Sequence, residues 1–238
     1  MQQEKITKKQ RRLLRQQGVT SSTQFRVRQV TPLTHNQRIA FDAFNKNKHI
    51  VLHGSAGTGK TFIALYLALN QVEIDNRYEK VVIIRSVVPS REIGFLPGSH
   101  RDKVKVYELP YYTVCEQLYG RGDGYEVLKQ KQRIEFVSTS FMRGLTLSNC
   151  IVIIDECQNM AWHELNTCFT RIGENCRVII CGDTKQSDLL DNTKHDLAKL
   201  LRVCKNMKSF EFVQMTVNDI VRSGFCKEFL IQCDNLGY

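Results

Sequence analysis

Hydrophobic residues along the chain gather in short runs that alternate with longer stretches of mixed polar and apolar character. Such short runs, rich in Val and Ile, predict buried strands, and they lie at 49–53, 81–85, 134–137, 151–154, 177–181 and 209–215. Helical spacing of apolar residues occurs between them, at 60–72, 111–120, 164–173 and 196–204. This alternation predicts an α/β fold with a mostly parallel sheet covered on both faces. Ligands on such sheets bind at the carboxyl ends of the strands.

The start of the chain differs from the rest in charge. The sequence carries a formal net charge of +10. Residues 1–30 hold eight Lys or Arg and one Glu, so 8 − 1 = +7 of that charge lies there. We therefore divide the chain into a basic N-terminal arm, 1–30, and one domain, 31–238. A basic arm suits the phosphate backbone of a nucleic acid, although a disordered solubilising tail would have the same composition.

Two local patterns mark the entry to the domain. The alternating segment 25–30 (FRVRQV) predicts a short strand. Thr34 is placed to cap a helix, with Gln37 three residues later and apolar residues following at helical spacing.

Bulk composition excludes several classes of protein. No apolar run approaches the roughly 18 residues of a membrane span, and the first 18 residues lack the apolar centre of a signal peptide. The nine cysteines form no C-x-x-C pair, so reduced core thiols are expected rather than a metal site. We expect a cytoplasmic protein without a membrane partner.

The first core strand leads into GSAGTGKT, which fits the pattern G-x-x-x-x-G-K-[ST] and precedes a predicted helix. Backbone N–H groups of such a loop cradle phosphates, and the positive end of the helix adds to this attraction. Lys60 is expected to reach the β- and γ-phosphates of ATP, and the Thr61 hydroxyl to ligate Mg²⁺. The predicted ATP-binding residues of the loop are Gly54, Ser55, Ala56, Gly57, Thr58, Gly59, Lys60 and Thr61.

Two adjacent acids, Asp155 and Glu156, follow the buried run 151–154. In a P-loop enzyme the acid that ends a neighbouring strand holds Mg²⁺, which predicts Asp155 as a metal residue. Glu156 is then the candidate general base for the attacking water. The alternative is that both acids stabilise the N-terminus of the next helix, and the P-loop makes the metal interpretation the stronger one.

Two further residues could complete hydrolysis. Gln186, in CGDTKQSDL after the next strand, could sense the γ-phosphate or position water, or it could be an ordinary polar loop residue. Arg222, in NDIVRSGF, could stabilise transition-state charge in its own chain or in a neighbouring copy; a structural salt bridge is the alternative.

The blocks GSAGTGKT, DECQN, GDTKQSDL and DIVRSG, with SREIGFLPGS (90–99), SFMRGLT (140–146) and TRIG (170–173), resemble the PhoH-like family of P-loop ATPases. That family is similar to the first RecA-like domain of superfamily 1 helicases. The match runs from about Pro32 to about Ile231, and it looks like the compact bacteriophage type, which would act in the cytoplasm of a bacterial host. The resemblance implies a three-layer RecA-like P-loop core.

The resemblance also implies roles for residues outside the P-loop. Gln37 is similar to the helicase glutamine that reads the adenine edge. Arg85 and Ser86 occupy a position that resembles a helicase motif in contact with a nucleic-acid backbone, although family members usually have proline directly after this arginine. Thr139 to Arg143 follow the strand 134–137 and could also face a bound strand or the γ-phosphate; Thr139 and Arg143 are the nucleic-acid candidates there.

Two features bear on assembly. The turn at 94–98 carries apolar Phe95 and Leu96 and could be a subunit interface, a nucleic-acid loop or a segment packed on its own chain. If Arg222 acts on a neighbouring copy, the protein must self-associate, and a ring closes such head-to-tail contacts. The resemblance implies a hexamer.

These observations predict a magnesium-dependent ATP hydrolase that acts with RNA or single-stranded DNA and could have helicase-like motor activity. An ATP-gated binding switch with slow turnover and no unwinding is the alternative. A P-loop kinase for a small molecule is disfavoured because no acceptor-binding or lid segment is recognisable.

Overall fold

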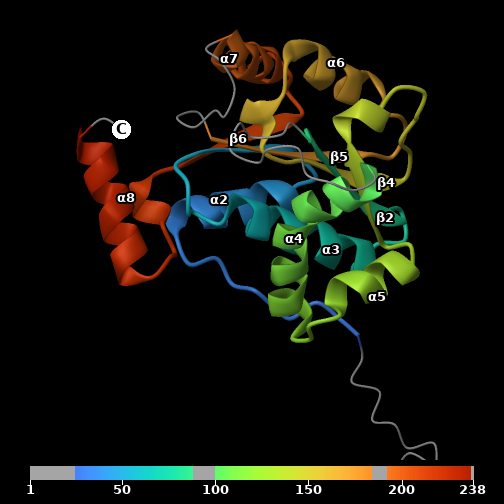
Figure 1. The fold of residues 1–238 in the computed structure, drawn as a ribbon, viewed down its shortest axis with the longest axis horizontal. Coiled ribbons are helices and arrows are strands. Elements are labelled where there is room, and N and C mark those ends of the chain that lie inside the picture. Colours follow the sequence, from blue (N-terminus) through green and yellow to red (C-terminus); the bar gives the residue numbers. More distant parts are fainter. Residues whose placement is uncertain (1–24, 88–99, 184–191, 237–238) are drawn as a thin grey trace, which may run out of the picture.

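A computed structural model describes residues 25–87, 100–183 and 192–236 (Figure 1). Six strands form one sheet in the order β3-β2-β4-β5-β1-β6, and each neighbouring pair is parallel. The strands are β1 His49–Gly54, β2 Lys80–Arg85, β3 Ile134–Ser138, β4 Cys150–Ile154, β5 Arg177–Gly182 and β6 Phe210–Met215. The predicted α/β class with a parallel sheet is confirmed.

Helices cover both faces of this sheet, as Figure 1 shows. One face carries α2 His35–Asn45, α3 Lys60–Ile74, α4 His100–Tyr119 and α5 Gly124–Gln130, and the other carries α6 Trp162–Thr170 and α7 Asn192–Lys205. The last helix, α8 Gly224–Leu236, extends beside the sheet. The result is a three-layer arrangement of helices, parallel sheet and helices, as the resemblance implied.

Alternation of side chains along each strand builds the two cores. Ile151 and Ile153 of β4 pack into the core under α3, whereas Val152 and Ile154 pack into the core under α6 and α7. Because a strand turns successive side chains to opposite faces, a strand between two helical layers must be apolar throughout. All five residues of β4 are accordingly buried.

Residues 25–30 are not a strand, so that prediction was wrong. The N–H of Val27 donates to the carboxylate of Glu73 at 3.0 and 3.2 Å, and the N–H of Arg28 donates to the carbonyl of Leu118 at 2.8 Å. Phe25 stacks on Tyr119 with ring centroids 4.3 Å apart. The alternating pattern therefore reflects an extended strap across helices, and its backbone partners are helix groups rather than a neighbouring strand.

The boundaries of the N-terminal arm and of helix α4 also differ from the predicted ones. Residues 25–30 of the predicted arm pack on the core, and residues 1–24 lie outside the described residues. Helix α4 begins at His100, before the predicted start at 111, and continues through Pro110. Within the described ranges, no helix has the length and apolar character needed to span a membrane.

Candidate functional site

The turn after β1 is shaped by three glycines with positive φ. Gly54, Gly57 and Gly59 have φ angles of 117°, 73° and 81°, a region that other residues adopt only with strain. A Cβ atom on Gly54 would lie 2.0 Å from the carbonyl oxygen of Met215 in β6. The Thr58 side chain is fully buried, and its hydroxyl donates to the carbonyl of Ser55 at 2.9 Å. The sequence therefore enforces a tight loop with its backbone close to the cavity.

Lys60 is the first residue of α3 and lies at the centre of this turn. Its ammonium donates to the carbonyls of Gly54 and Ser55, both at 2.8 Å. The loop thus holds a positive charge over its own backbone, at a helix N-terminus that also attracts anions. This combination of N–H groups, helix end and lysine can bind phosphate.

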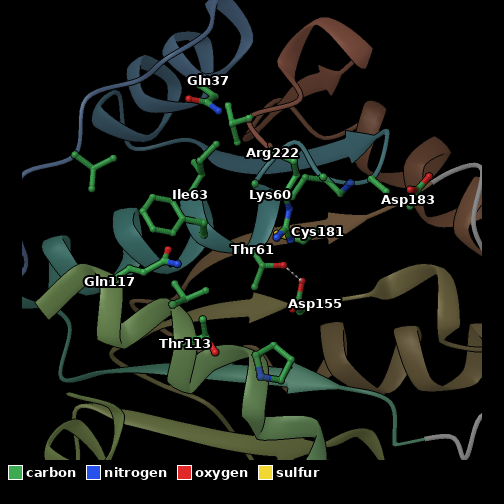
Figure 2. Close-up of a pocket in the computed structure, with 18 of the residues that line it drawn as sticks. Gln37, Lys60, Thr61, Ile63, Thr113, Gln117, Asp155, Cys181, Asp183 and Arg222 are labelled. Carbon is green, nitrogen blue, oxygen red and sulfur yellow. Dashed lines mark hydrogen bonds between the residues drawn. The ribbon is translucent and has the colours of Figure 1, made fainter. Parts of the chain in front are cut away.

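Asp155 meets the next residue of α3 across the sheet. The Thr61 hydroxyl donates to Oδ1 of Asp155 at 3.0 Å (Figure 2). Helix α3 follows β1 and Asp155 follows β4, and β5 lies between these two strands in the sheet. Asp155 is 2 % exposed. Burial raises the pKa of Asp155 to about 6, and the charge of Glu156 adds to the rise, against the lowering effect of its hydrogen-bond donors. A buried carboxylate in this setting is stabilised by an added cation.

The oxygen atoms of Thr61 and Asp155 are the hard ligands that Mg²⁺ prefers. Among the residues that the structure describes, no three His, Cys, Asp or Glu side chains gather into a metal cluster. A site with few protein ligands suits Mg²⁺, which keeps waters and shares substrate phosphates. The residues present therefore fit a magnesium ion at this position.

Tyr111 is a site residue that sequence reasoning missed. It lies in α4, is fully buried, and donates its hydroxyl to Oδ2 of Asp155 at 2.9 Å. Together Tyr111 and Thr61 give each carboxylate oxygen of Asp155 a donor, which fixes its orientation. No spacing rule connects residues 44 positions apart, so the pattern of the chain could not reveal this contact.

Glu156 has a left-handed backbone, with φ 52° and ψ 41°. A non-glycine residue in this region costs roughly 1–3 kcal/mol and is often found at functional sites. Its carboxylate accepts a hydrogen bond at 2.6 Å from the amide of Gln158, which also accepts the N–H of Asp183 at 3.0 Å. Gln158, which the sequence did not single out, thus ties the acidic loop to the end of β5.

Gln37 lies beside the phosphate loop, at the start of α2. Its side-chain oxygen accepts the N–H of Leu33 at 2.8 Å, and its amide nitrogen lies 3.5 Å from the Thr58 carbonyl. Thr34 caps the helix through the N–H of Gln37 at 3.3 Å. The capped helix therefore presents the predicted adenine-reading residue to the same cavity as the P-loop.

Arg222 lies in the cleft of its own chain. The N–H of the preceding residue, Val221, lies 3.4 Å from the carbonyl of Gly57. The side chain of Arg222 passes beside Gly57 and lines the cavity, as Figure 2 shows. Gln186 lies outside the described residues, whereas Asp183, three residues earlier, is buried and lines the same cavity.

The four candidates for nucleic-acid contact are placed in three different environments. Arg85 lines the cavity that contains Lys60. Ser86 and Thr139 are nearly buried, and both donate to the carboxylate of Glu164, Ser86 at 3.1 Å. Arg143 is exposed.

One cavity of about 730 Å³ joins these parts. Ligand pockets of a few hundred to about 1,000 Å³ commonly hold a molecule of nucleotide size. The P-loop, Asp155 and Glu156 line it, together with apolar side chains from the strap, the segment before α2, and helices α2, α3 and α4, namely Val30, Leu33, Phe41, Phe62 and Val114. The cavity thus offers a place for phosphates and a place for a flat apolar group.

Comparison with known proteins gives consistent matches. The family model described as PhoH-like protein matches residues 29–233. A PhoH-like protein of Bacillus subtilis is 33 % identical over 190 residues, covering 79 % of this chain and 59 % of that protein. Protein PhoH of Escherichia coli is 31 % identical over 190 residues, covering 79 % and 53 % respectively. The chain thus spans less than two thirds of the length of these relatives.

Solved structures show a more distant likeness. The Pif1 helicase of Candida albicans is 14 % identical, with a TM-score of 0.38 over 87 % of this chain and 44 % of that protein.

Proposed function

The chain belongs to the PhoH-like family, and from this premise and the geometry of the cleft we propose that it is a magnesium-dependent ATP hydrolase that acts with RNA or single-stranded DNA. The observation that carries the proposal is the 3.0 Å contact between Thr61 and Asp155 in the cavity that also holds Lys60. It brings together the phosphate-binding and acidic motifs of a nucleotide hydrolase.

Each residue has a role that follows from its position. Lys60 leaves the loop carbonyls and turns to the β- and γ-phosphates, and Gln37 contacts the base. Thr61 and Asp155 would hold Mg²⁺, which when bound neutralises phosphate charge. Glu156 accepts a proton from the attacking water. Arg222 acts in cis, since its side chain lies beside Gly57 of its own P-loop. Gln186 lies outside the described residues, so its role in sensing the γ-phosphate or positioning water stays a prediction from the sequence.

The proposal of a nucleic-acid partner rests on charge. Eight Lys or Arg and one Glu lie in residues 1–30, and such a segment binds phosphate backbones in a salt-dependent way. The strap, which is the last part of the arm at residues 25–30, reaches the cavity through Val30, so a nucleic acid bound to the arm would lie next to the nucleotide site along the chain. Exposed Arg143 adds a positive group after β3.

The bond between Gln158 and Glu156 favours a second candidate, a switch with slow turnover. The Gln158 amide donates to Oε2 of Glu156 at 2.6 Å and fixes the orientation of this carboxylate, and in the proposed switch that orientation directs it away from the attacking water. A partner that breaks this bond would then stimulate hydrolysis. The motor and the switch therefore differ in how far a polynucleotide raises the rate and whether strands separate.

Self-association has support from α8. Phe225 and Phe229, four residues apart in this helix, are 82 % and 60 % exposed. Exposed apolar side chains that lie close together are common at contact surfaces. Because Arg222 lies in its own cleft, a ring is not required to complete the site; a hexameric ring remains the prediction from the family. Light scattering of the wild type and of a Phe225→Ser, Phe229→Ser variant tests it, and an unchanged mass would remove α8 from the interface.

The decisive experiment measures ATP hydrolysis with and without single-stranded RNA and DNA. Lys60→Ala should abolish turnover, and Glu156→Gln should lower kcat by roughly 10²- to 10⁴-fold while ATP still binds. Stimulation with strand separation supports a motor, and stimulation without it supports a switch. Wild-type turnover in the Lys60→Ala protein would refute the assignment of the cleft.

A further inference from the structure

Arg85 is placed at the carboxyl end of β2, directly beside the acidic loop. Ile84 pairs with Ile154 of β4, and the N–H of Asp155 donates to the carbonyl of Ile84 at 2.9 Å. This register leaves Arg85 and Asp155 as neighbours where the two strands end. The Arg85 side chain is half-buried and lines the cavity that contains Lys60.

The surroundings of Arg85 favour a retained positive charge. A guanidinium stays protonated at any physiological pH, and that of Arg85 lies close enough to Tyr111, Asp155 and Glu156 to interact with all three. The guanidinium lies over the Tyr107 ring, 5.7 Å from its centroid. Two acids and two tyrosines thus surround the Arg85 guanidinium in the cavity wall, between the acidic motif and helix α4.

We propose that Arg85 contacts the terminal phosphate of the bound nucleotide, in the cleft of its own chain, instead of a polynucleotide backbone. This inference rests on the proposed function, because it requires a triphosphate on the P-loop. The fork of a guanidinium matches the oxygens of a phosphate and can engage two of them at once. Arg85 approaches from β2, beside Asp155, whereas Lys60 approaches from α3.

The strand end around Arg85 supports this direction of approach. The next residue, Ser86, is nearly buried and donates to Glu164 at 3.1 Å, which anchors the backbone on the α6 side of the sheet. Arg85 therefore faces the nucleotide cavity from a fixed strand end. A contact that reads charge at one end of the nucleotide should distinguish a triphosphate from a diphosphate.

The test compares affinities for a non-hydrolysable ATP analogue and for ADP, both with Mg²⁺, by calorimetry. Arg85→Ala should lower the affinity for the analogue about 10- to 100-fold, the range expected for a hydrogen bond to a charged group. It should lower the affinity for ADP less than about threefold. Arg85→Lys should recover part of the difference because it restores the charge but not the fork. Arg202→Ala, which removes an exposed arginine of α7, is the matched control and should bind both like the wild type.

The proposal would be overturned if Arg85→Ala weakened the affinities for the analogue and for ADP equally. It would also be overturned if Arg85→Ala kept the wild-type preference for the analogue over ADP but bound single-stranded RNA more weakly. If Arg85→Ala does not fold, Arg85→Gln keeps much of the side-chain volume and should show the same loss of preference. Failure of the proposed function has another signature, because Lys60→Ala would then bind both nucleotides normally. If Lys60→Ala binds nucleotide poorly but Arg85→Ala keeps the wild-type ratio of affinities for the analogue and ADP, the proposed function stands and only the role of Arg85 is rejected.

Discussion

At the amino end of the sheet, the buried Arg177 begins β5 and donates to the backbone carbonyls of Phe44 and Lys48. Its guanidinium also lies 3.6 Å from the centroid of the Phe44 ring. At the carboxyl end, the buried Asp155 accepts hydrogen bonds from the side-chain hydroxyls of Thr61 and Tyr111 and lies next to a second acid, Glu156.

The difference is in what stabilises each buried charge. Main-chain carbonyls cannot leave Arg177 without unfolding the segment, so its charge is part of the framework. The hydroxyl hydrogens of Thr61 and Tyr111, in contrast, can turn to another acceptor without unfolding, and the second acid beside Asp155 increases the benefit of a cation. We therefore expect loss of the buried charge at the amino end to lower stability and loss of the buried charge at the carboxyl end to impair nucleotide chemistry.

Among the variants that compare the two ends of the sheet, Asp155→Asn should have the largest effect. Losing a metal-holding carboxylate should remove several kcal/mol of transition-state stabilisation, so hydrolysis should fall roughly 10²- to 10³-fold. Steady-state ATPase rates across a magnesium titration measure it. A variant with normal kcat and normal magnesium dependence would contradict the assigned role and weaken the contrast between the two ends.

Asp155→Asn should also change the stability of the protein, in a way that depends on pH. A carboxyl whose pKa is raised to about 6 binds protons more tightly in the folded than in the unfolded protein, so this contribution to stability falls as pH rises from about 4 to 6. Without metal and nucleotide, Asp155→Asn should be more stable than wild type above pH 6, by up to about 3 kcal/mol, with the gain absent below pH 4. Urea unfolding at several pH values tests this; an equal gain at every pH would contradict it.

Gly54→Ala tests how tightly the carboxyl end is packed. The new Cβ would lie 2.0 Å from a backbone oxygen of Met215, at a φ of 117°. Strain and displacement of β6 should lower the free energy of unfolding by about 3–4 kcal/mol. Gly224→Ala is the control, because open space surrounds that position, and it should change stability by about 1 kcal/mol or less. Equal losses in both variants would show that the loop is not constrained.

Arg177→Met tests the amino end. Removing the guanidinium leaves the carbonyls of Phe44 and Lys48 without this donor, which should cost about 2–3 kcal/mol of unfolding free energy. Affinity for the ATP analogue should stay within about twofold of wild type when measured below the unfolding transition, since Arg177 lies at the opposite end of the sheet from the P-loop. A loss of nucleotide affinity without a loss of stability would reverse the comparison.

The smallest expected effect concerns Cys150 and Cys176, also at the amino end, whose sulfur atoms lie 3.6 Å apart. The hydrogen bond from Cys150 lowers the pKa of Cys176, and the thiolate is the reactive form. Cys176 should therefore be alkylated at lower pH than an ordinary thiol, and Cys150→Ala, which removes the donor, should reduce this advantage. Peptide mapping after iodoacetamide treatment between about pH 5 and 9 measures it; ordinary reactivity of Cys176 would contradict it.

Much of the fold was accessible from local pattern. The predicted strand at 177–181 corresponds to β5 at Arg177–Gly182, and the other strands agree similarly well, because apolar runs rich in β-branched residues match buried parallel strands. The strap at 25–30 was misread, since alternation records which side chains are buried and not what the backbone bonds to. Helix α4 was cut short because proline, such as Pro110, usually disfavours a helix interior.

The sequence by itself determined the chemistry that depends on neighbours along the chain: glycines with positive φ, a lysine at a helix start and two acids at a strand end. Only the tertiary structure decided that Tyr111 reaches Asp155, that Arg85 faces the nucleotide cavity and that Arg222 lies over its own P-loop. The physical reason is that these contacts join segments far apart in the chain. They depend on how α4 and the loop before α8 pack against the sheet, and no local periodicity encodes that packing.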